Sequence, residues 1–394
     1  MDELSKTLLT LGSLMLLGMA TDYLGRRTAL PRVTLLLIFG VVIGPAVLDL
    51  LPAVSRLWFP VIADMALLMV GFLLGERLVF SFIRENGHKV LGISLAVVVT
   101  TMLVVAGGLL AVGASLIMVL LLAAIATATA PAATTDVVHE LKADGPFTRV
   151  LLGIVAIDDA WGLIVFSFCL AAATTLSGGG DALTVVLHGM WELGGAVLLG
   201  LALGVPMAYL TGRIRAGEPT LAEALGLVFF CGGLALWLEV SFLLAAMVMG
   251  GTVANLAKHH QRPFHEIQHI EWPFMILFFV LAGAALNVDA LLSVGIIGGA
   301  YIVLRTLSRL VGAWFGGLFT HANKMERRWM GAALMPQAGV ALGMALVATQ
   351  RIPELADTLL PIVISATVFF ELVGPILTRL ALKRAGEVGK EVAQ

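Results

Sequence analysis

The sequence predicts an all-α polytopic membrane protein, and two features of the chain lead to that prediction. Of its 394 residues, 59% are hydrophobic and only 13% are charged, whereas about 25% of the residues of a soluble globular domain are charged. Apolar runs close to the roughly 20 residues that cross a bilayer recur along the whole chain. The connections between them are short, and no stretch is long and polar enough to form a soluble domain.

We expect thirteen transmembrane helices, with boundaries good to a few residues. Eleven are continuous apolar runs, and the fifth and twelfth are interrupted. The expected spans, in order, are 6–25, 30–50, 58–76, 89–112, 115–138, 147–175, 183–212, 219–237, 240–257, 270–287, 292–319, 328–349 and 357–380.

Positive charge lies mostly on one side of this predicted arrangement. Nearly all lysines and arginines near the span ends follow an odd-numbered span, and only Lys6, Arg56 and Arg351 lie on the other side. Because cytoplasmic loops carry the excess of positive charge, we expect the N-terminus outside and the C-terminus in the cytoplasm. The regular bias also supports an odd number of spans, since one missed span would scramble it.

Proline interrupts two of the predicted spans. The fifth contains AIATATAPAATTD (124–136) and the twelfth contains GAALMPQAGVALG (331–343). Proline breaks the helical hydrogen bonding, and in hydrocarbon the freed carbonyls need partners inside the protein. The breaks are seven spans apart, and this odd offset makes the two helices run in opposite directions. We therefore expect inverted repeats, with spans 1–6 matching 8–13, and a substrate site where the two discontinuous helices cross. The alternative is two ordinary kinked helices.

Few charged side chains lie inside the predicted spans. Each costs at least about 2.5–3.5 kcal/mol at the centre of a membrane, so we expect them to face the interior of the bundle and to serve transport. For Asp64, Glu371 and Arg305 the alternative is a structural role in bracing helices. The candidates are Asp64, Asp158, Asp159, Arg305, Arg309 and Glu371.

The adjacent acids Asp158 and Asp159 point about 100° apart around a helix, so they cannot face the same way. Arg305 and Arg309 are four residues apart and share one face. We expect one aspartate to pair with an arginine while the other stays free for a cation. The alternative is that both acids only form salt bridges between helices.

A monovalent cation prefers oxygen ligands, and the free carboxylate supplies two. Backbone carbonyls near Ala128–Pro131 and the hydroxyl of Thr129 can supply more. The same carboxyl group can instead hold a proton, since burial disfavours its charged form. Competition between the two cations at one site that opens to alternate faces produces obligatory exchange, and this mechanism requires no cofactor.

The chain resembles bacterial sodium/proton antiporters of the cation:proton antiporter superfamily, in particular the NapA-like branch (monovalent cation:proton antiporter-2 type). The likeness covers nearly the whole length, and its specific part is the pair of aspartates beside an unwound, proline-containing helix. It rests on LPRVTLLLIFGVVIGP (30–45), APAATTDVVHELKADGPFTRVLLGIVAIDDAWGL (130–163), FFVLAGAALNVDAL (278–291), RTLSRLVGA (305–313), ALMPQAGVALGMAL (333–346) and TVFFELVGP (367–375).

The resemblance implies an NhaA/NapA-like antiporter fold in which residues 1–394 form one membrane transporter unit of a homodimer. An ion-translocating core would slide against a fixed dimerisation scaffold, in the manner of an elevator, in the plasma (inner) membrane of a bacterium. The implied core is 89–175 and 292–380, the scaffold is 6–76 and 219–287, and 183–212 is the linker helix.

By the same resemblance, Asp159 binds the Na⁺ or the proton, Asp158 is its salt-bridged partner, and Arg309 is the charge partner. Pro131 and Gln337, in the two interruptions, are possible supporting residues. NapA-like members commonly have lysine where this chain has Arg309. Because arginine does not deprotonate in proteins, this difference favours one proton per cation. The alternative is two protons, one on each aspartate.

Other functions remain open at this stage. The same acids would serve a K⁺/H⁺ antiporter or another cation-coupled transporter. An intramembrane aspartyl protease needs aspartates on two different helices, and a channel would show a symmetric filter or a charged ring. We therefore expect a transporter and not an enzyme, embedded in the lipid bilayer and with no nucleic-acid partner. The segment after the last span is short, so we expect no nucleotide-binding regulatory domain.

Overall fold

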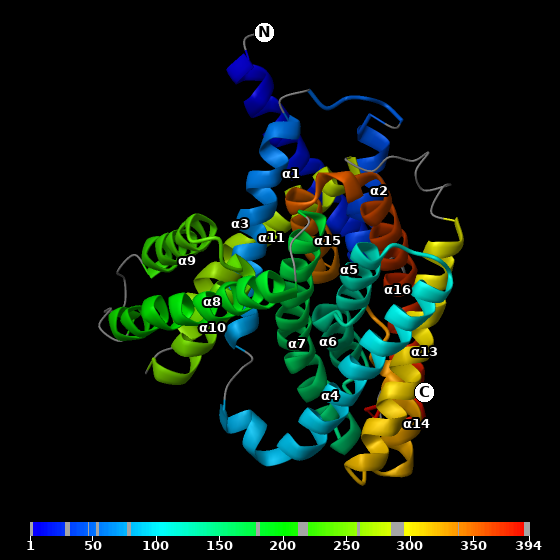
Figure 1. Ribbon diagram of the computed structural model, residues 1–394. Helices are drawn as coiled ribbons and strands as arrows, with labels where there is room; N and C mark the ends of the chain where they lie inside the picture. The colour runs from blue at the N-terminus through cyan, green and yellow to red at the C-terminus, as the bar shows by residue number, and fades with distance from the viewer. Residues whose placement is uncertain are drawn as a thin grey trace.

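The computed structural model describes residues 3–27, 32–45, 47–52, 55–76, 80–178, 182–211, 220–257, 261–284, 295–337 and 339–389. Within these residues the fold is helical and contains no strand (Figure 1). The helices are α1 (Glu3–Arg27), α2 (Arg32–Ile43), α3 (Ser55–Glu76), α4 (Phe80–Ala111), α5 (Leu116–Ala126), α6 (Pro131–Glu140), α7 (Pro146–Ser177), α8 (Ala182–Thr211), α9 (Thr220–Trp237), α10 (Phe242–Leu256), α11 (Gln261–Ala284), α13 (Gly295–Phe319), α14 (Lys324–Ala333), α15 (Gly339–Arg351), the 3₁₀ turn η1 (Pro353–Leu355) and α16 (Ala356–Ala385).

Each expected span contains a helix, and each of the two interrupted spans contains two. The second span, expected at 30–50, is helical only over Arg32–Ile43, because the chain turns from Gly44 onward. The fifth span is α5 followed by α6, and the twelfth is α14 followed by α15. Two helices begin well before their apolar runs, α4 at Phe80 and α11 at Gln261. Helical hydrogen bonds lie within the backbone and do not require apolar side chains, so a helix can extend into a polar flank. Residues 285–294, which include parts of two expected spans, lie outside the described residues.

Six of the described helical segments are long and apolar enough to cross a membrane: Gly87–Ala111, Pro146–Ser177, Gly189–Leu210, Arg262–Ala284, Gly295–Phe319 and Pro353–Ala385. Leu116–Ala126, Leu221–Trp237 and Phe242–Leu256 are shorter apolar helices. These segments make the protein an integral membrane protein, while the full set of thirteen crossings stays a prediction.

The helices pack in two groups. In the first, α4 lies along α13, α14 packs against α13 and α16, and α7 contacts α4 and α5. In the second, α10 packs against α3 and α8, and α11 packs against α2 and α3. Helix α8 contacts both α7 and α10, and Figure 1 shows it on the side of the molecule away from α13. The long contact between α4 and α13 depends on small residues: a Cβ on Gly312 would lie 2.8 Å from the Cα of Val97.

Ion pairs and a cap join several helices of the first group at one end. Lys89 of α4 lies 3.3 Å from Glu326 of α14, and Arg379 of α16 lies 2.6 Å from Glu140 of α6. The segment after α16 continues this connection, because the carboxylate of Glu387 accepts hydrogen bonds from the first turn of α7. The described C-terminal segment is therefore attached to the helix that contains both aspartates.

Candidate functional site

The two helix interruptions meet inside the bundle. Residues 127–130 are unwound between α5 and α6, and residues 334–337 are unwound after α14. The amide of Ala130 donates to the carbonyl of Pro336 at 2.8 Å, so the two breaks are joined directly. Pro131 stands at the first position of α6, where its missing N–H costs nothing. Helix α16 passes closely behind: a Cβ on Gly374 would lie 2.7 Å from the Cα of Pro336.

Arg305 of α13 satisfies carbonyl groups from both interruptions. Its Nε and Nη2 donate to Ala126 and Ala128, at 3.2 and 2.9 Å, and its Nη1 donates to Met335 at 2.9 Å. The guanidinium carbon also lies 4.2 Å from the ring centre of Phe370 on α16, a cation–π distance. A cation at the carboxyl end of α5 also interacts favourably with the helix dipole. Through its hydrogen bonds, Arg305 links the two interruptions.

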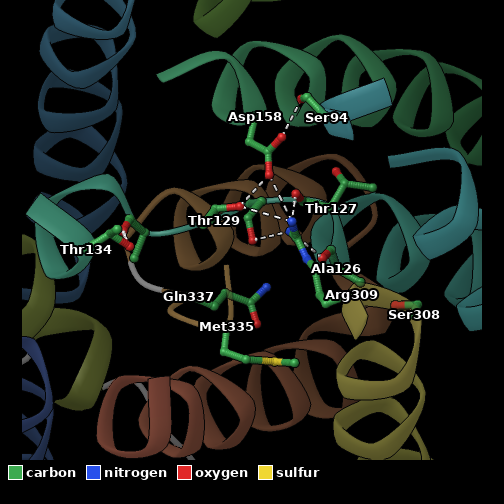
Figure 2. Close-up of polar contacts among 12 residues, drawn as sticks. Ser94, Ala126, Thr127, Thr129, Thr134, Asp158, Ser308, Arg309, Met335 and Gln337 are labelled. Carbon is green, nitrogen blue, oxygen red and sulfur yellow. Dashed lines mark hydrogen bonds and ion pairs between the residues drawn. The ribbon is translucent and has the colours of Figure 1, made fainter. Parts of the chain in front are cut away.

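Arg309, one turn further along α13, makes the same kind of contact and adds an ion pair. Its Nη2 donates to the carbonyls of Ala126, Thr127 and Ala128. Its Nη1 lies 2.9 Å from Oδ2 of Asp158. Both charged side chains are fully buried. Figure 2 shows the guanidinium between the chain at residues 126–129 and the carboxylate.

Asp158 is held by three donors from three different segments. Oδ1 accepts from the Ser94 hydroxyl of α4 at 2.5 Å, and Oδ2 accepts from the Thr129 hydroxyl at 2.7 Å and from Arg309. The Thr129 oxygen also accepts from Nη1 of Arg309 at 3.1 Å (Figure 2). A buried ion pair is tolerated only when further hydrogen bonds satisfy its remaining atoms, and here both carboxylate oxygens are engaged.

Gln337 occupies the second interruption and reaches the last turn of α5, just before the first. Its Nε2 donates to the carbonyl of Ile125 at 3.0 Å and to the hydroxyl of Tyr301 at 3.2 Å. Its Oε1 is buried and has no hydrogen-bond partner among the described residues. Among the described residues, the amide oxygen of Gln337 is therefore a buried acceptor next to the crossing that no protein donor engages.

A comparison with known protein families decides the class of protein. Residues 12–384 match the model described as sodium/hydrogen exchanger, transmembrane. The chain belongs to the sodium/hydrogen exchanger family. It is therefore a membrane-embedded member of a family of cation/proton antiporters, which are transporters and not enzymes.

Two curated relatives of this exchanger are antiporters by name. One is the ammonium/H⁺ antiporter subunit AmhT of Alkalihalophilus pseudofirmus, 22% identical over 71% of this chain and 70% of that protein. The other is the Na⁺/H⁺–K⁺ antiporter GerN of Bacillus cereus, 24% identical over 80% of this chain and 81% of that protein. Both similarities extend over most of the exchanger.

Solved structures match the fold. The sodium proton antiporter MjNhaP1 of Methanocaldococcus jannaschii at pH 8 superposes with a TM-score of 0.80 at 18% identity, over 97% of this chain and 99% of that one. An electron-microscopy structure of the same antiporter gives a TM-score of 0.70, over 99% of this chain and 100% of that one. At this identity the superpositions show a shared fold and no more.

The other residues singled out in the sequence lie in different settings in the exchanger. Glu371 is buried on α16, directly after the Phe370 that contacts Arg305. Asp64 of α3 is only partly buried and accepts a hydrogen bond from Gln350 of α15 at 3.3 Å. Asp159 lies in α7, but its side chain lies outside the described residues, so its role as a cation ligand stays a prediction.

Two residues of this polar cluster had no signal in the sequence. Ser94 is one of several small polar residues in an apolar helix, and nothing in its neighbourhood points to Asp158. Tyr301 holds Gln337 from the start of α13. The carbonyls around Ala128, which we expected to be free for a cation, instead accept hydrogen bonds from the two arginines.

Proposed function

We propose that the protein exchanges Na⁺ (or Li⁺) for H⁺ across the membrane, with Asp159 as the carboxylate that holds either ion. Asp158 would be its salt-bridged neighbour, Arg309 the charge partner, and Thr129 part of the same polar cluster. The observation that carries this proposal is the buried contact of 2.9 Å between Arg309 and Asp158 at the crossing of the interruptions. Asp158 balances the charge of Arg309. The charge of the adjacent Asp159 is then left for a transported cation to balance.

The chemistry at this position fits a hard monovalent cation. Such an ion takes carboxylate and amide oxygens, and the unpartnered Oε1 of Gln337 is an oxygen of that kind. We therefore propose that this site takes a transported alkali cation.

The exchange would proceed by elevator-type alternating access between inverted repeats in a thirteen-helix, NapA-like arrangement. The moving core is 89–175 and 292–380, the scaffold is 6–76 and 219–287, and 183–212 is the linker helix. The two packing groups, with α8 in contact with both, support this division. We further propose a homodimer in the inner membrane of a bacterium, with the N-terminus outside, the C-terminus in the cytoplasm, and a role in pH homeostasis.

A second candidate function is exchange of K⁺ or another monovalent cation for protons. The names of GerN and AmhT favour it, since they include K⁺ and ammonium. A carboxylate site does not by itself select among such ions, so the cation must be determined by experiment.

The test uses the full chain in liposomes that contain a pH-sensitive dye and carry an inside-acid pH gradient. Addition of Na⁺ or Li⁺ should dissipate the gradient, while the same concentration of K⁺ or NH₄⁺ should act more weakly. Asp159→Asn should abolish the response in a protein that still inserts and keeps its melting temperature. An undiminished Na⁺ response in Asp159→Asn would reject the proposed site, whereas a K⁺ response larger than that to Na⁺ would favour the second candidate.

A further inference from the structure

A cavity of about 440 Å³ opens between α14 and α16, away from the crossing of the interruptions. It is lined by Lys324, Met325, Arg328, Trp329 and Arg384. On α14, Lys324 and Arg328 are four residues apart, as are Met325 and Trp329, so a basic stripe and an apolar stripe line the cavity together. Figure 1 shows α14 beside the labelled C-terminal end of the chain.

The cavity is positively charged and its cations are exposed. Lys324, Arg328 and Arg384 are exposed, and none of them forms a salt bridge with an acid of the described residues. The guanidinium carbon of Arg384 lies 5.9 Å from the ring centre of Trp329, which brings the cation of α16 over the apolar stripe of α14.

The acid nearest in sequence does not neutralise this charge. Glu326 of α14 is fully buried and turned toward the protein, where its Oε2 accepts from Lys89 at 3.3 Å and from the amide of Asn323 at 2.8 Å. Because Glu326 is engaged inside, the outer face of α14 presents cations without a compensating carboxylate.

Two apolar surfaces lead to the cavity. On α16, Leu372, Ile376 and Leu380 recur every four residues with 37%, 67% and 38% of their surface exposed, and Arg384 continues the same stripe. On α13, Phe319 is 75% exposed and is separated by one short turn from the start of α14. In a membrane-embedded protein such surfaces face acyl chains, so the basic cavity lies where these lipid-facing stripes end.

We propose that this cavity binds the phosphate of an anionic phospholipid headgroup, with the acyl chains lying along the exposed stripe of α16. Two arginines can each donate paired hydrogen bonds to a phosphate. Basic pockets between transmembrane helices are sites for such headgroups, and Trp residues are enriched at the level of the headgroups. A soluble phosphate would use the cations alone, and the apolar stripe favours the lipid. The cavity shares no residue with the proposed cation site, and its test measures lipid binding without ion exchange.

The test measures the melting temperature of the purified full chain in detergent after addition of dioleoyl phosphatidylglycerol or dioleoyl phosphatidylcholine. The anionic lipid should raise the melting temperature more than the zwitterionic lipid does. The double variant Arg328→Gln, Arg384→Gln should lose most of this difference. The matched control is the double variant Arg149→Gln, Lys383→Gln, which removes two exposed cations that do not line the cavity. This control should keep the difference between the two lipids.

A second variant and two soluble anions complete the experiment. Met325→Glu places a carboxylate in the cavity at a side chain that is already 36% exposed, so it should fold and lose the same lipid-specific rise. The proposal is overturned if Met325→Glu keeps the full rise, or if both double variants lose it equally. It is also overturned if inorganic phosphate or glycerol 3-phosphate reproduces the rise, because the site would then take soluble anions.

Discussion

Asp158 and Arg309 form a fully buried ion pair, with 2.9 Å between Oδ2 and Nη1, at the point where two unwound segments cross. The arginine also neutralises the carboxyl end of α5 through three carbonyls, and the aspartate is fixed by two hydroxyl groups. Arg309 is therefore attached to the end of α5 and Asp158 to α4, while the Thr129 hydroxyl contacts both, and removal of either charged residue leaves buried groups without partners.

Asp158→Asn should destabilise the protein strongly. It leaves Arg309 as a buried charge without a counter-charge, and removal of one partner of such a pair typically costs about 3–5 kcal/mol. We expect a lower melting temperature in detergent than for Asp136→Asn, a matched change at an exposed acid of α6. Equal melting temperatures of the two variants would mean that the pair is not needed for the fold.

Arg309→Lys should keep the positive charge but lose most of the carbonyl contacts. An ammonium has three donors, whereas the guanidinium donates to three carbonyls, Thr129 and Asp158. Arg305 also donates to the carbonyls of Ala126 and Ala128, so the carbonyl of Thr127 is the one that depends on Arg309. A buried carbonyl left unpaired costs about 1–3 kcal/mol, so the melting temperature should fall.

The same variant tests the stoichiometry of exchange. If the arginine holds its proton throughout, wild-type exchange in liposomes should not respond to an imposed membrane potential, while Arg309→Lys should respond. A wild-type rate that changes steeply with potential would contradict exchange of one proton per cation.

Ser94→Ala should weaken the site because Oδ1 of Asp158 loses its hydroxyl donor at 2.5 Å. We expect the free energy of unfolding to fall by about 1–3 kcal/mol, since a buried acceptor is left unsatisfied. Thr101→Val is the matched control on the same helix, because the buried Thr101 hydroxyl has no hydrogen-bond partner among the described residues. If the melting temperature falls equally in both variants, the hydrogen bond from Ser94 to Asp158 does not stabilise the protein.

Gly374→Ala should disturb the second interruption. The added Cβ would lie 2.7 Å from Pro336 Cα, which is too close, and such overpacking costs about 1–3 kcal/mol. Both the melting temperature and the exchange rate should fall. Gly299→Ala on α13 is the control, since its Cβ would meet nothing within 4 Å and alanine favours a helix. An unchanged exchange rate in Gly374→Ala would show that α16 yields to the extra methyl group.

Glu387→Gln should loosen the start of α7. The carboxylate accepts from the amides of Phe147 and Thr148 and from the Thr148 hydroxyl, each at 2.8 Å, while Gly145 at the cap position supplies no side chain. Loss of an anionic cap costs about 0.5–2 kcal/mol. Amides 147–149 should exchange hydrogen faster in mass spectrometry, and those of α14 should not. The control is Glu354→Gln, at an exposed residue outside this contact.

The sequence predicted the helices and the positions of both interruptions, for a simple physical reason. The length of an apolar run and the presence of proline are local properties, and in a membrane they decide where a helix can continue. The sequence also identified Asp158, Arg305 and Arg309 as candidates, since a charge in an apolar span is costly wherever the helix packs. Helix ends were predicted less well, as α4 and α11 show, because polar flanks can remain helical.

The tertiary structure decided most of the groups that the charged residues meet. Helical geometry required Asp158 and Asp159 to face differently but left open which one contacts an arginine. The family resemblance alone assigned Asp158 to Arg309, and the fold brings these two side chains together. The carbonyls of 126–128 and the hydroxyl of Ser94 are chemically ordinary, so no residue pattern could assign them to Arg305, Arg309 or Asp158. These contacts join residues more than 60 positions apart in the chain, and their partners are set by how whole helices pack.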